Sequence, residues 1–378
     1  MPCASTVLII GGGIAGLSSA IALSRLGISC EILEKSDNKE GASIGFTGQA
    51  TEALSELGLY DLVYKAGHPF PHDTKVAAMR DAAGNLLSSG PKRDVPSTVK
   101  EGVGIYRPTL IEIMSKVATD LGVKIIFGTT FTKIDNHDDG VTVDFTTGEQ
   151  RTYDLLLGAD GIGSATRGVL FPGCLEPTYS GQWSIRWIAP GPPVEPESWY
   201  KSDVGKMGFY SLPEGPESVI YVPSVFNVPE NKRMGEEEVK QMFTSLLDSM
   251  TAPAVVELRR RLGSDAQLIG RPFRWLLLPD PWFSKRALLI GDAAHATTAH
   301  MGMGGGMALE DSVVFAQCIR DAKTVNDAFI AFMARRFERV AFVVNTSLGL
   351  SRLEQENASP AESMGLLGKA WATIMDSY

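Results

Sequence analysis

The N-terminal part of the chain has the hydrophobic pattern of a strand, a helix and a second strand. Residues 6–10 are a short run of mostly apolar, branched side chains, as in a buried parallel strand. Apolar positions then recur at helical spacing over residues 15–26, and Gly27 stands where a helix commonly ends. A further apolar run covers residues 29–34. The pattern therefore predicts a βαβ unit of about 30 residues.

The rest of the chain continues with strands and helices, and from residue 179 its pattern becomes that of antiparallel strands. Before residue 179 we expect helices over 51–57 and 109–120, a hairpin of 76–80 with 86–88, and strands over 123–127, 130–135, 141–145 and 155–157. From 179 to about 275 we expect antiparallel strands over 183–189, 206–212, 217–223 and 267–275, with helices over 236–249 and 252–262. A strand over 286–291 and helices over 304–319, 324–348 and 361–375 complete the prediction. The fold class is α/β with an inserted antiparallel sheet and C-terminal helices.

Composition and charge narrow the functional classes. The 378 residues are 44% hydrophobic, as in an ordinary globular protein, and the net charge of −9 argues against a nucleic-acid partner. The four cysteines form no CxxC pair, so we expect no metal site and a reducing compartment. We see no signal peptide and no stretch near the roughly 20 apolar residues of a membrane span. A cytoplasmic protein is expected.

The first glycine-rich turn has the pattern of a dinucleotide site. Gly11, Gly13 and Gly16 satisfy GxGxxG between the first strand and its helix, and Glu34 ends the second strand. The glycines allow a tight turn, the approach of a pyrophosphate and close packing of helix on strand, while the helix N-terminus favours phosphate. Glu34 can accept hydrogen bonds from ribose hydroxyls and would repel a 2′-phosphate, so NADP is not expected in this groove. The structural alternative is a glycine-rich turn beside a surface glutamate.

A second turn of small residues follows the strand at 286–291. Asp292 begins it, and the sequence Gly302-Met303-Gly304-Gly305-Gly306 opens the next helix. Small residues let backbone lie against a flat ligand, and the helix N-terminus favours negative charge on it. Asp292 can accept hydrogen bonds from a polyhydroxy chain. A plain strand-to-helix turn is the alternative interpretation.

A third turn, Gly158-Ala159-Asp160-Gly161, comes directly after the buried strand at 155–157. The carboxyl ends of parallel strands are where open α/β sheets bind ligands, so Asp160 is a candidate for flavin or nicotinamide binding. The alternative is structural: Asp160 caps the turn while Arg167 pairs with a carboxylate.

These three motifs, in this order, resemble the single-component FAD-dependent aromatic hydroxylases, the para-hydroxybenzoate hydroxylase-like class A flavoprotein monooxygenases. The resemblance runs from residue 6 to about 345, and Arg107 and the R-x-x-R of Arg336 and Arg339 fit it too. It implies a Rossmann-type FAD-binding domain with an inserted substrate sheet. The division that it suggests is 1–75, 101–178 and 276–350 for FAD, 76–100 and 179–275 for substrate, and 351–378 as a C-terminal helical segment.

The resemblance also implies where FAD lies. Its AMP half would contact Gly11, Gly13, Ala15, Glu34 and Lys35, and the backbone near Phe131 would touch the adenine. Arg107 and Asp292 would hold the pyrophosphate and ribityl chain. Gly302 to Gly306 would lie along the flavin ring, with Gly45 on its other side. Three positions depart from the family pattern: Gly48, Ala299 and Met303 replace its usual residues near the ring.

By the same resemblance, NADPH or NADH reduces FAD, O₂ adds to give a flavin C4a-hydroperoxide, and a small aromatic or heteroaromatic substrate is hydroxylated. Arg186 would orient a carboxylate or phenolate, Tyr210 would relay a proton or contact substrate, and His300 is the candidate base by position. Each has a structural alternative: an ion pair, a core tyrosine and a satisfied histidine. The quaternary state would be a monomer or homodimer.

Two other functions compete with hydroxylation. A reductase, oxidase or halogenase could use the same scaffold, although residues 183–190 lack the W-x-W-x-I-P segment of such halogenases. The departures at Gly48, Ala299 and Met303 also leave open a non-catalytic flavin-binding protein. Oxygen uptake and NAD(P)H oxidation separate these functions.

Overall fold

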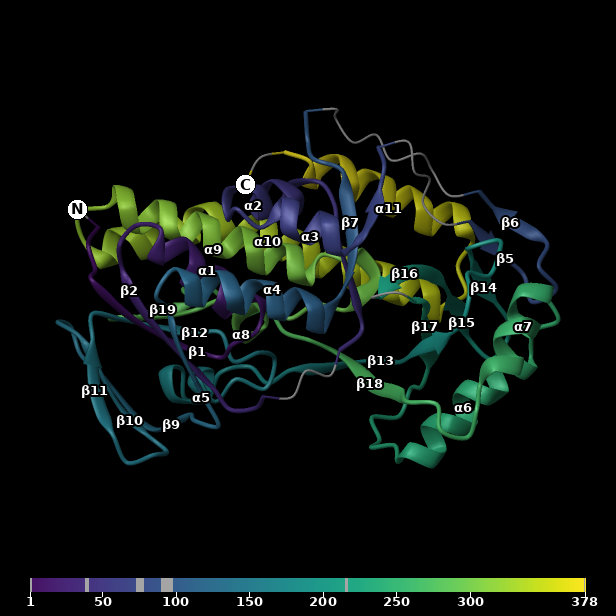
Figure 1. Ribbon diagram of the computed structural model, residues 1–378, viewed down its shortest axis with the longest axis horizontal. Coiled ribbons are helices and arrows are strands. Elements are labelled where there is room, and N and C mark those ends of the chain that lie inside the picture. The colour runs from purple at the N-terminus through teal and green to yellow at the C-terminus, as the bar shows by residue number, and fades with distance from the viewer. Residues whose placement is uncertain (1, 38–40, 73–77, 90–97, 215–216, 377) are drawn as a thin grey trace.

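The predicted βαβ unit forms the start of a parallel sheet. The computed structural model describes residues 2–37, 41–72, 78–89, 98–214, 217–376 and 378 (Figure 1). Strand β1 (Thr6–Ile10) is buried beyond its first residue and pairs in parallel with β2 (Ser29–Glu34). Helix α1 (Ile14–Ser24) makes the crossover, so the prediction for this segment is confirmed to within two residues at each end.

This sheet has six strands in the order β19-β20-β12-β1-β2-β8, all parallel except β19 at its edge. Its other strands are β8 (Lys124–Phe127), β12 (Leu155–Gly158), β19 (Phe283–Ser284) and β20 (Ala287–Leu289). Because β1, β12 and β20 are parallel neighbours, their carboxyl ends lie side by side. The three small-residue turns found in the sequence therefore meet at one edge of the sheet.

Helices pack around this sheet and around the carboxyl ends of its strands (Figure 1). They are α2 (Gln49–Glu56), α3 (Tyr60–Ala66), α4 (Arg107–Asp120), α5 (Ala165–Leu170), α8 (Asp292–His295), the 3-10 turn η1 (Ala299–Met301), α9 (Gly304–Asp321), α10 (Val325–Gln355) and α11 (Pro360–Ile374). Helices α1 and α9 pack together, and the Ser312 hydroxyl lies 2.6 Å from that of Ser18 and 2.8 Å from that of Ser19. The two helices that follow glycine-rich turns are thus in direct contact.

Two three-stranded sheets flank the parallel sheet. One consists of β9 (Phe131–Asn136), β10 (Val141–Phe145) and β11 (Gln150–Tyr153), which share an apolar cluster with β1, β2 and β12. The other consists of β3 (Ser43–Phe46), β4 (His68–Phe70) and β7 (Gly102–Tyr106), in the order β3-β7-β4. Strand β3 carries Gly45 towards the cavity described below.

An eight-stranded sheet forms a second layer with its own core. Its strands are β5 (Met79–Arg80), β6 (Leu86–Ser88), β13 (Thr178–Pro190), β14 (Trp199–Lys201), β15 (Lys206–Gly208), β16 (Tyr210–Glu214), β17 (Glu217–Asn227) and β18 (Leu268–Trp275). Helices α6 (Glu236–Asp248) and α7 (Pro253–Arg261) share its apolar cluster, and Figure 1 shows them at the end of the molecule away from β9–β11. No helix in the described part of the chain is long and apolar enough to cross a bilayer.

Several boundaries differ from the sequence prediction. The expected strand over 206–212 is two strands, because the chain breaks at Phe209 between β15 and β16. Helix α10 continues past the expected end at 348 to Gln355, so the predicted division at 350 falls inside a helix. Strands β3, β4, β7 and β14 and helix α3 were not expected, since they are short and lack a clear period. The first residues of the predicted hairpin, 76–77, lie outside the described residues.

A buried ion network joins α10 to residues in the N-terminal half of α9. The fully buried Arg336 donates from Nη1 to Glu310 (2.7 Å) and from Nε to Asp311 (2.8 Å). The other Asp311 oxygen accepts the Gly291 amide at 3.0 Å and lies 2.6 Å from His295 Nε2. Burial opposes ionisation of Asp311, but His295 and Arg336 outweigh it and lower its pKa to about 2. The network therefore holds the turn after β20 against α9.

Replacement of Arg336 should destabilise the protein strongly. Arg336→Met removes the guanidinium that pairs with both buried carboxylates and leaves only Arg339 at Glu310 and His295 at Asp311. Removal of one partner of a buried ion pair costs about 3–5 kcal/mol. Urea unfolding measures the loss. The control is Arg320→Met, because Arg320 pairs with Asp321 in solvent and should leave the unfolding free energy nearly unchanged. Equal small effects in both variants would contradict the role given to the network.

Candidate active site

One large cavity lies between the parallel sheet and the eight-stranded sheet. Its volume is about 1340 Å³, and residues of both layers and of α10 and α11 line it. Predicted site residues that line it are Gly13, Ala15, Gly45, Arg107, Arg186, Tyr210, Asp292, His300, Gly302, Gly304 and Gly305. The cavity thus brings together most of the residues singled out in the sequence, from both sides of the molecule.

The N-terminus of α1 opens into this cavity at Gly13. This residue is the N-cap, no side chain caps the helix, and its first turn carries no acidic residue. A Cβ atom added to Gly13 would meet no atom within 4 Å, so the space beside its backbone is free. Uncapped amides with a positive dipole end and an open approach suit a phosphate group.

The second glycine-rich turn forms another part of the wall. Gly302 has φ of +65°, a left-handed conformation that favours glycine, and Met303 leads into α9 without a side-chain cap. At Gly305 an added Cβ would lie 2.4 Å from Ile44 Cδ1, so the Ile44 side chain of β3 packs directly on the glycine backbone of α9. Gly45 of β3 and Gly304 and Gly305 of α9 line the same cavity without side chains, which suits a flat ring.

Arg107 and Asp292 line the cavity between these two helix ends. Arg107 is the first residue of α4, and Asp292 is the first of α8. Desolvation by the surrounding protein raises the pKa of Asp292, although the charges of His295 and Arg107 act in the opposite direction. A guanidinium and a carboxyl group placed here can serve a pyrophosphate and a hydroxylated chain, respectively. The residues present therefore fit FAD.

Some predicted cofactor residues lie outside the cavity lining. Glu34 accepts hydrogen bonds from the amides of Gly12 (2.6 Å) and Ser36 (2.8 Å). Its oxygens keep further lone pairs, so this contact is compatible with ribose binding. Lys35 is exposed beside it, and Phe131 packs with the apolar cluster under β9. The adenine contact expected near Phe131 stays a prediction.

Three more predicted residues have packing roles in the structure. A Cβ added to Gly11 would lie 2.5 Å from the Ala159 carbonyl oxygen, and one added to Gly16 would lie 1.9 Å from the Gly11 carbonyl oxygen. A Cβ added to Gly306 would lie 2.9 Å from Ala50 Cβ. These glycines allow chain segments to pack closely.

Asp160 also has a structural environment. It accepts hydrogen bonds from the Ser164 hydroxyl at 2.5 Å and from the amide and hydroxyl of Thr166, both at 3.0 Å. These contacts stabilise the turn into α5. Arg167 pairs with no carboxylate of a described residue and instead donates to the carbonyls of Ala293 and Ile162.

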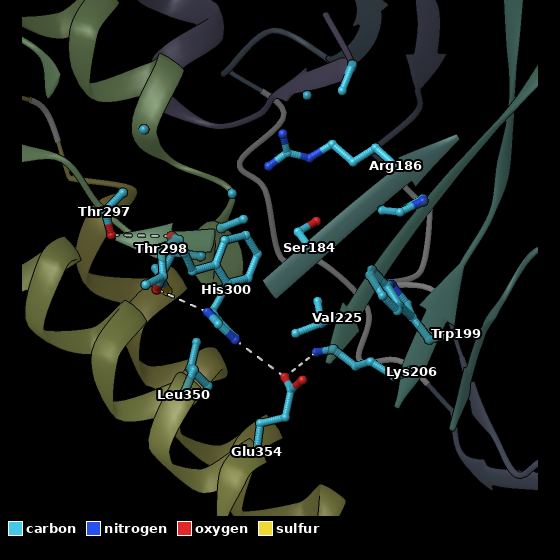
Figure 2. A pocket seen from close by; sticks show the side chains of 18 of the residues that line it. Ser184, Arg186, Trp199, Lys206, Val225, Thr297, Thr298, His300, Leu350 and Glu354 are labelled. Carbon is cyan, nitrogen blue, oxygen red and sulfur yellow. Dashed lines mark hydrogen bonds and ion pairs between the residues drawn. The ribbon is translucent and has the colours of Figure 1, made fainter. Parts of the chain in front are cut away.

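The eight-stranded sheet forms another wall of the cavity. Figure 2 shows Arg186 extending from its strand into the pocket, and its guanidinium has no hydrogen bond or ion pair with any described residue. Tyr210 donates to the Ser43 hydroxyl at 2.9 Å and packs edge-on against Tyr221. Burial raises the pKa of both tyrosines, and the nearby Arg186 charge acts against this rise at Tyr221. Both phenols therefore stay neutral donors at pH 7.

His300 lies at the other side of the pocket in a row of polar groups (Figure 2). Its Nδ1 lies 3.0 Å from the Thr298 hydroxyl, and its Nε2 lies 3.4 Å from Oε2 of Glu354. The same oxygen of Glu354 binds the ammonium of Lys206. Burial lowers the pKa of His300, which leaves the imidazole neutral at pH 7. The sequence did not predict Lys206 or Glu354 as site residues, because neither belongs to a local motif.

The three departures from the family pattern do not close the cavity. Ala299 and Met303 line it, and both sit in regular local structure at η1 and at the start of α9. Gly48 has φ of +61° and precedes α2; a Cβ there would lie 2.9 Å from the Met375 sulfur. Among the described residues, no group of three or more His, Cys, Asp or Glu side chains could hold a metal ion.

Comparisons with known proteins agree with this geometry. The model of a family described as "FAD binding domain" matches residues 4–322. The chain is 30% identical to the aurachin C monooxygenase/isomerase of Stigmatella aurantiaca, over 93% of this chain and 91% of that protein. It is 28% identical to the FAD-dependent urate hydroxylase of Klebsiella oxytoca, over 89% and 87%. A variant of Klebsiella pneumoniae HpxO in complex with FAD has the same fold, with a TM-score of 0.82, 23% identity and coverage of 98% and 96%.

The fold, together with a cavity between the parallel sheet and the eight-stranded sheet whose residues fit FAD, is that of a flavoprotein oxidoreductase. The chain belongs to the FAD binding domain family. It is an FAD-dependent monooxygenase of class A, the aromatic hydroxylase group, and uses NAD(P)H as that class does.

Gly13→Val should abolish FAD retention without unfolding the chain. The new side chain would enter the free space beside the α1 N-terminus and block the pyrophosphate, while it meets no protein atom at Cβ. The measurement is flavin absorbance per chain after purification, together with a thermal melt. Gly168→Val is the matched control, since that position is also open but lies on the exposed face of α5. Full flavin content in Gly13→Val would show that FAD does not bind there.

Proposed function

We propose that the protein hydroxylates an electron-rich, acidic heteroaromatic ring with NAD(P)H and O₂. The observation that carries this proposal is Arg186: a guanidinium without a partner among the described residues extends into the cavity that also contains the FAD residues. A partly buried cation that faces a cavity suits a substrate with a carboxylate, a phenolate or an enolate oxygen. The urate hydroxylase among the relatives acts on a substrate of this chemical type.

The residues of the chain would bind, orient and activate the ring. FAD, once reduced by NAD(P)H, supplies the activated oxygen that is transferred to the substrate. Arg186 would hold an anionic oxygen of the ring, and the Tyr210 hydroxyl would donate a hydrogen bond near it. His300, neutral and buried, would accept the proton that a ring hydroxyl or ring N–H loses, which raises the electron density of the ring. The apolar wall that includes Phe273 would exclude water.

The cellular and quaternary predictions belong to the same proposal. We propose a cytoplasmic enzyme, which the free state of Cys3, Cys30, Cys174 and Cys318 supports. We propose a monomer or a homodimer as the quaternary state. Helix α11 packs against α10 of its own chain. The domain division stated above also stays a proposal, supported by the pairing of β5 with β14, since residues 79–80 thereby belong to the eight-stranded sheet.

The test of the function is substrate-stimulated NAD(P)H oxidation with oxygen uptake, using urate and hydroxypyridine carboxylates as first candidates. Hydroxylated product in step with NAD(P)H consumption is expected. NAD(P)H oxidation without oxygen uptake would indicate a reductase instead. A protein that binds FAD but never oxidises NAD(P)H with any of these rings would contradict the proposal.

Arg186→Met should weaken substrate binding while FAD stays bound. Loss of a charged hydrogen bond of about 1.5–3 kcal/mol corresponds to a KM raised about ten- to a hundredfold, with more hydrogen peroxide released per NAD(P)H. Initial rates and a peroxide assay measure both. Arg260→Met on the exposed face of α7 is the control and should behave as wild type. Unchanged kinetics in Arg186→Met would remove Arg186 from the substrate site.

A further inference from the structure

Lys206, Glu354 and His300 form a row of charged and polar groups that connects three distant parts of the chain. Lys206 lies on β15 of the substrate sheet, Glu354 near the end of α10, and His300 in η1 beside the second glycine-rich turn. All three line the cavity, and Figure 2 shows them in order from the sheet to the turn. The His300 side chain is 5% exposed, and its Nε2 has no fully formed hydrogen bond.

The charge on Glu354 determines which nitrogen of His300 carries the proton. Burial opposes ionisation of Glu354, but Lys206 and His300 outweigh it and lower the pKa of this carboxyl to about 2. An ionised carboxylate only accepts hydrogen bonds, so the facing Nε2 must carry the hydrogen of the neutral imidazole. Nδ1 is then the acceptor nitrogen, and it accepts a hydrogen bond from the Thr298 hydroxyl at 3.0 Å.

We propose that Glu354 and Lys206 are positioning residues for His300: Glu354 fixes the imidazole with Nδ1 as its proton acceptor, and Lys206 limits the strength of that base. This inference rests on the function proposed above, because it assigns the control of the group that takes the substrate proton. Neither residue contacts the reacting atoms by this account. They act through His300 alone.

Proton transfer through this arrangement balances without another reactant. The substrate O–H or N–H bond breaks, and its proton passes to the Thr298 oxygen while the Thr298 hydroxyl proton forms the new N–H bond at Nδ1. The imidazolium that results keeps its Nε2–H towards Glu354, whose negative charge balances the new positive charge. The logic is that of a histidine oriented by a carboxylate.

The two charges act on His300 in opposite directions. Besides burial, the groups that bias its protonation are Glu354 of α10, which favours the imidazolium, and Lys206 of β15, which disfavours it. Phe273 of β18 packs edge-on against the ring and adds no charge. Removal of the Glu354 charge and removal of the Lys206 charge should therefore shift the pKa of His300 in opposite directions. If the two residues formed only a structural ion pair, both removals should change the pKa of His300 in the same way.

The experiment is a histidine titration by NMR on the FAD-loaded protein, which needs no substrate. The chain has only five histidines, and His300→Gln assigns the resonance. Glu354→Gln keeps the size of the side chain and removes its charge, so the pKa of His300 should fall by about one unit, a tenfold loss of proton affinity. Lys206→Met should raise the pKa of His300 by a comparable amount. Lys232→Met, in the solvent-exposed pair with Glu238, should change nothing.

The outcomes separate this inference from the proposed function. Opposite shifts support the positioning roles, and a parallel shift of the acid limb of kcat/KM in each variant ties them to turnover. Shifts in the same direction, or none in Lys206→Met, overturn the inference even if the enzyme hydroxylates its substrate normally. If Glu354→Gln does not fold, Lys206→Met decides alone. Absence of NAD(P)H oxidation in the wild type contradicts the proposed function and not the measured shifts.

Discussion

The architecture of the site depends on one buried interaction, the ion network of Arg336 with Glu310 and Asp311. Its members come from α9 and α10, and through Asp311 it also holds the Gly291 amide and His295. A buried carboxylate without a cation is costly, so these segments can come together only in an arrangement that satisfies all the charges. The network thereby fixes the turn after β20 and the start of α9, which form one wall of the cavity.

That constraint also determines where the first glycine-rich turn can lie. Gly291 sits so close to α1 that an added Cβ would lie 2.9 Å from Ala15 Cβ, and Ser312 of α9 bonds to two serines of α1. Two uncapped helix N-termini are thus held beside one space. Their positive dipole ends would favour the FAD phosphates at one of them and negative charge on the ring system at the other. We infer that the close packing of small residues also sets the electrostatics of the flavin site.

The parts that the sequence predicts well are those in which a local pattern has a local cause. The glycines at 11–16 and the acid at Asp292 follow parallel strands, so sheet topology alone brings them to one edge. Glu354 and Lys206 are in contact although about 150 residues separate them in the sequence. No local sequence pattern predicts that contact. The break at Phe209 and the extension of α10 to Gln355 were missed for a related reason: tertiary packing, rather than local propensity, decides where these elements end.

The central claim is that the two helix ends bind a single FAD between the sheets. A crystal structure of the protein with FAD tests it most directly. The account requires one FAD per chain, with its pyrophosphate at the N-terminus of α1 beside Gly13 and its ring along residues 302–305, facing Arg186. A pyrophosphate bound elsewhere, or a ring outside the space between Gly45 and Gly305, would contradict the account.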